Sequence, residues 1–158
     1  LKIFNKILLL VFLSLIINFT TLIIYPTNFV RFGILHLLSL SLVFLQILAP
    51  FGNIIPLISG LIMFIIFISV LNKKYSNNII LNSIGVKPNY STMDYFPIFK
   101  WFWLVGLGYY ISQNVKITPQ KFSNKFLKLV KNIGKRSLYI YIAHFPIIFT
   151  IHKIFKIY

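Results

Sequence analysis

The sequence contains almost no acidic side chains. Asp94 is the single carboxylate residue among 158, against 16 lysines and arginines, and the formal net charge is +15. Chemistry that needs two carboxylates, such as glycoside hydrolysis or carboxylate-ligated metal catalysis, is therefore excluded for these residues. An acid in a chain that otherwise avoids acids is the first place to look for a functional site, and Asp94 opens the segment Asp94-Tyr95-Phe96-Pro97.

Cysteine is absent as well, which excludes disulfides, thiolate nucleophiles and zinc–cysteine sites. The three histidines, His36, His144 and His152, are too far apart in the sequence to form a metal-binding motif, so no metal site is predicted. No small-residue cleavage site follows the first apolar run, so no cleavable signal peptide is predicted. The chain starts at Leu1, and we expect it to be truncated at its N-terminus.

Long apolar runs fill most of the sequence. Hydrophobic residues make up 58% of it and the mean hydropathy is +0.87, above the roughly 45–50% apolar content of soluble domains. The runs are continuous rather than alternating, which indicates membrane-spanning helices and not barrel strands. The predicted fold is all-α, a polytopic transmembrane helix bundle of about five spans forming one transmembrane domain over residues 1–158. The predicted spans cover residues 7–25, 32–48, 54–71, 96–115 and 137–151.

The positive charge predicts contact with a lipid bilayer, because lysines at helix ends bind anionic headgroups and set topology. Nucleic acid is not a predicted partner, since the basic residues are not interleaved with base-stacking aromatics on a soluble fold. With the N-terminus in the cytoplasm, nine basic residues fall on the cytoplasmic side and seven on the other. This difference favours a cytoplasmic N-terminus in a multi-pass integral membrane protein.

Residues 116–136 form a basic segment in which lysines alternate with Phe126, Leu129 and Ile133. This pattern predicts an amphipathic helix at the membrane interface, acting as a cytoplasmic anchor. The alternative is that the segment attracts a polyanionic cofactor, such as a nucleotide-bearing thioester.

Histidines within predicted spans require an explanation, because polar groups in lipid are costly. His36 either bonds to a neighbouring helix or lines a ligand cavity, with Arg31 as an anion contact. His144 precedes Pro146, which frees a backbone carbonyl near the imidazole. That arrangement is typical of a site, although packing alone also explains it.

Asp94 has two interpretations. It caps the helix predicted at 96–115, in which Pro97 takes a first-turn position, or it faces a cavity as a substrate-binding carboxylate. In the span 54–71, Pro56 and Gly60 predict a kink and close helix packing.

Three blocks together resemble the membrane-bound heparan-alpha-glucosaminide N-acetyltransferase catalytic family, including its small bacterial and archaeal members. They read VRFGILHLLS at residues 30–39, DYFPIFKWF at 94–102 and GKRSLYIYIAHFP at 134–146. The family's Asp-x-x-Arg-Gly helix opening and its early histidine have no counterpart, so the chain resembles the C-terminal two-thirds of the family. Lys100 stands where the family tends to have proline, and Trp103 where glycine is usual.

The resemblance implies a multi-pass acyltransferase in the cytoplasmic membrane of a prokaryote. Such an enzyme moves an acetyl group from acetyl-CoA, held from the cytoplasmic side, to an amino sugar or similar small-molecule acceptor. By this resemblance the substrate cavity and the candidate catalytic groups would involve His36, Asp94 and His144, with Trp101 at the border. The cofactor-binding residues would be Arg31, Lys135 and Arg136.

Two other functions stay open at this point. One is a non-catalytic membrane protein or decayed remnant of the family. The other is a small transporter, suggested by helices that contain Pro56 and Pro146. The sequence is also compatible with a homo-oligomer.

Overall fold

The computed structural model describes residues 2–92, 94–115, 125–144 and 147. The chain divides into two compact units, Leu1–Lys116 and Ile117–Tyr158, and each is described by itself. The described residues are mostly helical, which confirms the predicted all-α class.

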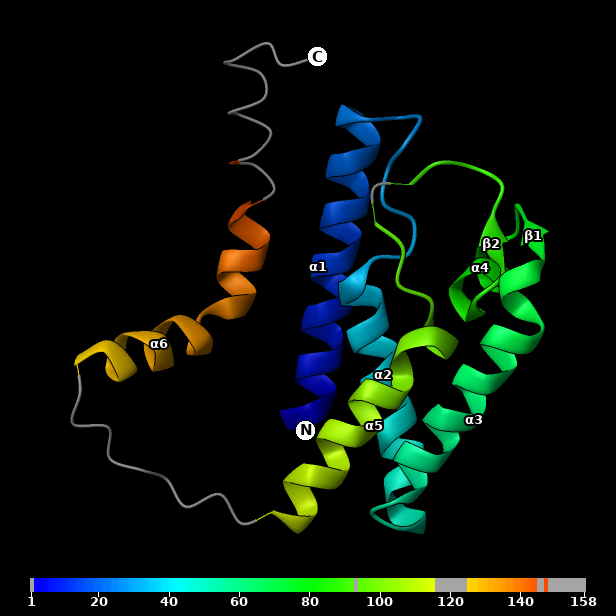
Figure 1. Ribbon diagram of the computed structural model, residues 1–158. Helices are drawn as coiled ribbons and strands as arrows, with labels where there is room; N and C mark the ends of the chain where they lie inside the picture. Colours follow the sequence, from blue (N-terminus) through cyan, green and yellow to red (C-terminus); the bar gives the residue numbers. More distant parts are fainter. Residues whose placement is uncertain (1, 93, 116–124, 145–146, 148–158) are drawn as a thin grey trace. The chain divides into compact units, whose positions relative to one another are not determined.

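Four long helices build the first unit. They are α1 (Lys2–Ile24), α2 (Ile34–Leu48), α3 (Ile55–Ser69) and α5 (Ile98–Asn114). Helix α1 packs along α2, and α3 packs along α5. Helix α2 also contacts α5, and these two helices cross in Figure 1. Each helix lies within a few residues of a predicted span, except that α1 begins at Lys2. Its start is earlier because no glycine or proline precedes Pro26 to interrupt the helix.

Three described segments are long and apolar enough to cross a membrane: Ile3–Ile24, Ile34–Phe51 and Ile55–Lys73. Their outward side chains are large and apolar, and Ile23 at the end of α1 is 81% exposed. Lipid is the solvent that such a surface requires. Helix α5 has 17 residues, the lower end of the roughly 17–25 that span a bilayer. The predicted number of five spans stays a prediction, because residues 148–151 lie outside the described part of the chain.

The two ends of the first unit differ. The turn end carries the short connection between α2 and α3, where η1 (Ala49–Phe51) leads into Gly52 at φ 141°. The loop end carries the connection 25–33 and the longer segment 70–97, and there α1 and α3 end while α2 and α5 begin. All long connections of the first unit therefore gather at the loop end.

Helices α3 and α5 approach each other at two glycines. A Cβ atom added to Gly60 would lie 2.5 Å from the Cα of Trp103, and one added to Gly106 would lie 2.5 Å from the carbonyl oxygen of Pro56. The predicted close packing at Gly60 is confirmed. The predicted kink at Pro56 is wrong: α3 begins at Ile55, so Pro56 lies in the first turn, where its missing N–H breaks no helical bond.

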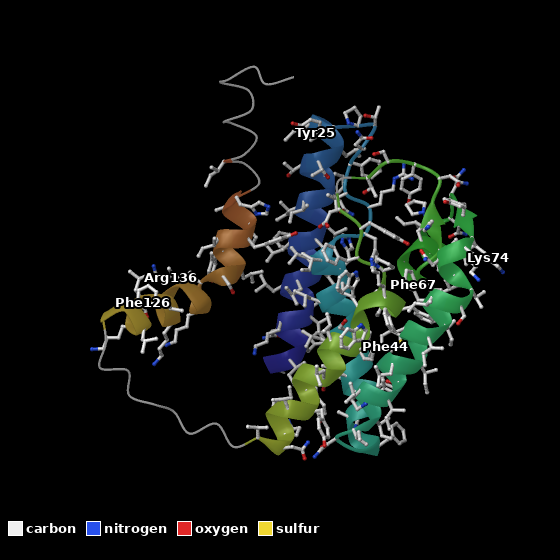
Figure 2. All side chains as sticks on the ribbon, viewed as in Figure 1. Tyr25, Phe44, Phe67, Lys74, Phe126 and Arg136 are labelled. Atoms are coloured by element: carbon white, nitrogen blue, oxygen red, sulfur yellow. The ribbon has the colours of Figure 1, made fainter. Side chains whose placement is uncertain are left out.

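The core of the first unit lies among α2, α3 and α5. Phe102 of α5 is completely buried, and Leu37, Leu45 and Ile98 are buried with it. Phe44 of α2, labelled in Figure 2, packs against this cluster with its ring centroid 5.6 Å from that of Phe102.

The segment 70–97 folds into short elements at the loop end. They are η2 (Leu71–Lys73), β1 (Tyr75–Ser76), α4 (Ile79–Ile84) and β2 (Lys87–Pro88), with β1 and β2 paired in parallel. Buried Asn82 joins them: in the amide orientation that satisfies both ends, its nitrogen donates to the carbonyls of Ser76 and Val86, and its oxygen accepts from the Tyr90 hydroxyl. The segment is thus a small folded cap and not an extended loop.

In the second unit, α6 (Lys125–Lys135) is followed by helical residues 137–144. Phe126 and Arg136 mark the two ends of α6 in Figure 2. The predicted amphipathic helix is therefore present. Pro146, whose effect on the last predicted span was considered above, lies outside the described residues.

Candidate functional site at the start of α2

Separate parts of the chain meet where α2 begins. Phe32, just before α2, forms a parallel bridge with Tyr95, and the N–H of Phe96 donates to the Phe32 carbonyl at 3.1 Å. Helix α1 also contacts this part of the chain, through Thr21 Oγ1, which accepts the N–H of Val30 at 3.2 Å. The sequence separation between these parts means that only the folded chain creates the site.

Asp94 binds the start of α2. Its Oδ2 accepts the N–H of Ile34 at 3.4 Å, and a Cβ atom at Gly33 would lie 2.7 Å from the same oxygen. Helix α5, by contrast, has Pro97 as its N-cap and no side-chain capping bond. Asp94 therefore caps α2 and not α5, the helix for which the sequence predicted it. A carboxylate at this position accepts a backbone N–H that has no partner within the helix, and its negative charge is stabilised by the positive end of the α2 dipole.

His36 uses both ring nitrogens. Nδ1 accepts the N–H of Gly33 at 3.3 Å, and Nε2 lies 3.3 Å from the Asn18 amide nitrogen. Because Nδ1 accepts a bond, the neutral imidazole carries its proton on Nε2, which must then donate.

The Asn18 amide supplies the acceptor when its oxygen, and not its nitrogen, faces His36. This orientation also gives a partner to Asn18 Oδ1, which is otherwise buried without one; amide oxygen and nitrogen are exchanged on such grounds. His36 thus donates to Asn18 of α1 and accepts from Gly33 at the start of α2. Both ring nitrogens of His36 are therefore engaged in hydrogen bonds.

Arg31 lies beside this cluster and is half-buried. Its guanidinium carbon is 3.7 Å from the centre of the Tyr90 ring and 4.7 Å from that of Phe29, a cation–π arrangement. The Thr92 hydroxyl lies 3.1 Å from the carbonyls of both Phe29 and Asp94. Thr92 therefore ties the connection before α2 to the strand of chain that carries Asp94.

Tyr95 closes the cap over the site. Its hydroxyl lies 2.8 Å from the carbonyl oxygens of both Asn82 and Val86. Burial, with a smaller contribution from Tyr90, raises the pKa of Tyr95 to about 12. The phenol therefore stays a neutral donor across the physiological range.

Trp101 lies on α5 near the same end, with its ring 5.6 Å from Phe96 and 5.0 Å from the Lys100 ammonium. Its indole N–H is buried, and no partner for it lies among the described residues. The Lys100 ammonium lies over the Trp101 ring. The prediction that Trp101 borders a substrate cavity stays a prediction.

The other predicted site residues belong to the second unit. Lys135 ends α6, Arg136 follows in a turn, and His144 bonds through Nδ1 to the Tyr141 carbonyl. Within the first unit the structure brings together Arg31, His36 and Asp94. The predictions for Lys135, Arg136 and His144 stay predictions.

Sequence reasoning missed Asn18, Thr21, Tyr90 and Thr92. The signal for Asn18 was available, because an amide inside the mostly apolar run 7–24 is as unusual as a histidine in a span. The other three are ordinary loop or helix-end residues, and only tertiary contacts single them out.

The chain was also compared with known proteins. The family described as heparan-alpha-glucosaminide N-acetyltransferase, catalytic, matches residues 1–146. The chain belongs to this family. No curated protein and no solved structure matches it. The matched range includes all three blocks from which the resemblance was drawn, and membership identifies the chain as part of a membrane acetyltransferase family.

The described residues of the loop end do not fit the acetyl-CoA donor that the family implies. A donor site needs cations for phosphate and a group that can reach a thioester. The side chains of His36 and Asn18 bond to each other. The Asp94 carboxylate accepts the backbone N–H of Ile34, and the Arg31 guanidinium lies over the Tyr90 ring. The polar groups of the cluster bond to one another or to backbone, and the cavity and catalytic roles predicted for His36 and Asp94 stay predictions. A donor contact by Arg31 stays a prediction.

Proposed function

We propose that the chain belongs to a membrane-bound acyltransferase that moves an acetyl group from acetyl-CoA to the amine of an amino sugar or similar acceptor. Family membership over residues 1–146 carries the proposal. The apolar helices support placement in a bilayer. Polar side chains held at the end of apolar helices also support it, because such groups are retained in membranes mostly at functional sites.

The cluster at the start of α2 would serve the acceptor side. With a cytoplasmic N-terminus, α1 ends on the opposite face of the membrane, and so does the loop end. A donor held from the cytoplasm would then approach the turn end. Arg31 lies at the loop end, so it could contact a donor held from the cytoplasm only if the N-terminus were on the other side of the membrane. We therefore assign Arg31 to the acceptor side.

Acetyl-CoA, when bound, supplies the acetyl group as a thioester. Acyl transfer forms an amide C–N bond and breaks the thioester C–S bond, which releases the CoA thiolate. A base takes the amine proton, and transfer of that proton to the thiolate gives CoA as the free thiol. His36 would orient α1 against α2 as a neutral imidazole and not take this proton. Asp94 would hold the start of α2 in place. We therefore expect another group of the enzyme to act as the base.

A second candidate is a family member that folds in the bilayer without catalysis. The observation favouring it is that both His36 nitrogens and the Asp94 carboxylate are used in structural bonds. A small transporter has less support, because Pro56 starts α3 and does not kink it.

Acetyl transfer by the full chain distinguishes these functions. The chain would be reconstituted in liposomes with radiolabelled acetyl-CoA and glucosamine, and its thermal stability measured with increasing acetyl-CoA. Transfer together with a saturable rise in stability supports the acyltransferase. Saturable stabilisation without transfer indicates a donor-binding part that needs further helices. Neither effect would support the non-catalytic member, and uptake of a labelled solute lost in Asp94→Ala would support the transporter.

A further inference from the structure

The second unit has a charge pattern that the proposed acetyl transfer does not explain. The charged side chains in residues 125–144 are all basic, and all five of them lie within residues 125–136. The apolar residues Phe126, Leu127, Leu129, Val130 and Ile133 are all exposed within the described chain. A surface that is both strongly basic and openly apolar is unusual for a protein that faces only water.

These residues separate into two faces of α6. At 100° per residue, Lys128, Lys131 and Lys135 fall on one side of the helix and Phe126, Val130 and Ile133 on the other. A short helix of this kind lies in the plane of a membrane surface, with its apolar face at the level of the acyl chains.

The helix turns sharply at its end and encloses a groove. Arg136 lies in the turn, its N–H donating to the Ile133 carbonyl at 3.0 Å, and the next helical residues follow directly. The open groove on the inside of this elbow measures about 770 Å³ and is lined by Lys128, Asn132 and Arg136 on one side and Leu129, Ile133 and Ile140 on the other. It therefore lies on the boundary between the basic and apolar faces.

The chain that carries this elbow is a membrane protein. Its first unit has three segments that are long and apolar enough to cross a bilayer, so lipid is part of the environment of the chain. A phospholipid is therefore a ligand available to the groove of the second unit.

We propose that the elbow groove binds an anionic phospholipid of this bilayer, with the phosphate between Lys128 and Arg136 and the acyl chains along Leu129, Ile133 and Ile140. Guanidinium and ammonium groups are the usual ligands of a phosphate. Basic pockets beside membrane helices bind anionic headgroups for the same reason. The apolar side of the groove distinguishes a lipid from a soluble phosphate. The proposal does not rest on acetyl transfer.

The test uses the full chain in dodecyl maltoside micelles, titrated with dioleoyl phosphatidylglycerol while bound lipid is counted by native mass spectrometry. The double variant Lys128→Gln/Arg136→Gln removes the two cations of the groove. The matched control Lys131→Gln/Lys135→Gln removes the same charge from the same helix outside the groove. All four side chains are exposed, so the helix content measured by circular dichroism should not change.

We expect phosphatidylglycerol to bind at least about tenfold more tightly than phosphatidylcholine. We expect the groove variant to lose on the order of tenfold in affinity, and the control to stay within about twofold. Dihexanoyl phosphatidylglycerol should bind more weakly than the dioleoyl lipid, because it covers less of the apolar side.

Equal weakening in the two variants would overturn the proposal, since it would mean diffuse attraction to the whole basic face. Equal binding of the two headgroups would overturn it as well. Displacement of the lipid by 1 mM inorganic phosphate, or by 1 mM acetyl-CoA, would assign the groove to a soluble phosphate ligand instead.

Discussion

The carboxylate of Asp94 accepts the N–H of Ile34 across 60 residues of sequence, and this bond connects the start of α2 to the segment that leads into α5. Gly33 makes the approach possible, because any Cβ there would lie 2.7 Å from Asp94 Oδ2. The only acidic residue of the chain therefore has a defined structural role, whatever the function of the site.

Asp94→Ala should lower the free energy of unfolding by about 1–2 kcal/mol, since it removes a helix cap and leaves a donor without its acceptor. Asp94→Asn keeps an acceptor oxygen and should cost less than half as much. The measurement is unfolding by sodium dodecyl sulfate in mixed micelles, followed by Trp101 and Trp103 fluorescence. Identical stability of the alanine variant and the wild type would contradict the capping role.

Asn18 and His36 should show energetic coupling. Asn18→Ala leaves the His36 Nε2–H without an acceptor and should cost about 1–3 kcal/mol. His36→Ala should cost a similar amount, and the double variant less than the sum, with a coupling of about 0.5–3 kcal/mol. The same unfolding measurement on all four proteins completes the cycle. Strictly additive effects would mean that the two side chains do not bond to each other.

The long helices could be predicted from sequence because apolar runs of this length have one stable form in a bilayer. The predicted spans 32–48, 54–71 and 96–115 agree with α2, α3 and α5 within a few residues. The small elements of residues 70–97 could not be predicted. They depend on Asn82 and Tyr95, whose partners are backbone carbonyls that local sequence does not mark.

In the candidate site, too, some residues could be predicted from the sequence and others could not. His36 and Asp94 could be singled out as polar residues in or beside apolar runs, and both lie at the start of α2. Their partners could not be predicted, because they depend on which helices become neighbours. Asp94 was predicted to cap the fourth span because it lies only a few residues before that span in the sequence. In the folded chain its carboxylate binds the start of α2 instead.

Gly60→Ala should destabilise the first unit by about 1–3 kcal/mol or more, because the added methyl group meets backbone atoms of Trp103 and not a movable side chain. Gly106→Ala should do the same through Pro56 and Leu57. Gly108→Ala is the matched control, since nothing lies within 4 Å of its Cβ position. It should be neutral or stabilising by up to about 1 kcal/mol, as expected for alanine in a helix. Equal losses at Gly60 and Gly108 would mean that α3 and α5 are not in close contact.

Tyr95 should make stability fall at alkaline pH. Its pKa is raised from 10.0 to about 12 in the folded protein, so folding favours the neutral phenol, which donates to the carbonyls of Asn82 and Val86. A raised pKa contributes stability that is complete below the unfolded value and is lost as pH rises from about 10 towards 12. Tyr95→Phe should be less stable than the wild type at pH 8 by about 0.5–1.5 kcal/mol. It should also lose less stability than the wild type between pH 9.5 and 11.5. Lysines also titrate over this range, but their contribution is the same in both proteins and drops out of the comparison. Parallel pH profiles for the two proteins would show that the Tyr95 hydroxyl does not bind these carbonyls.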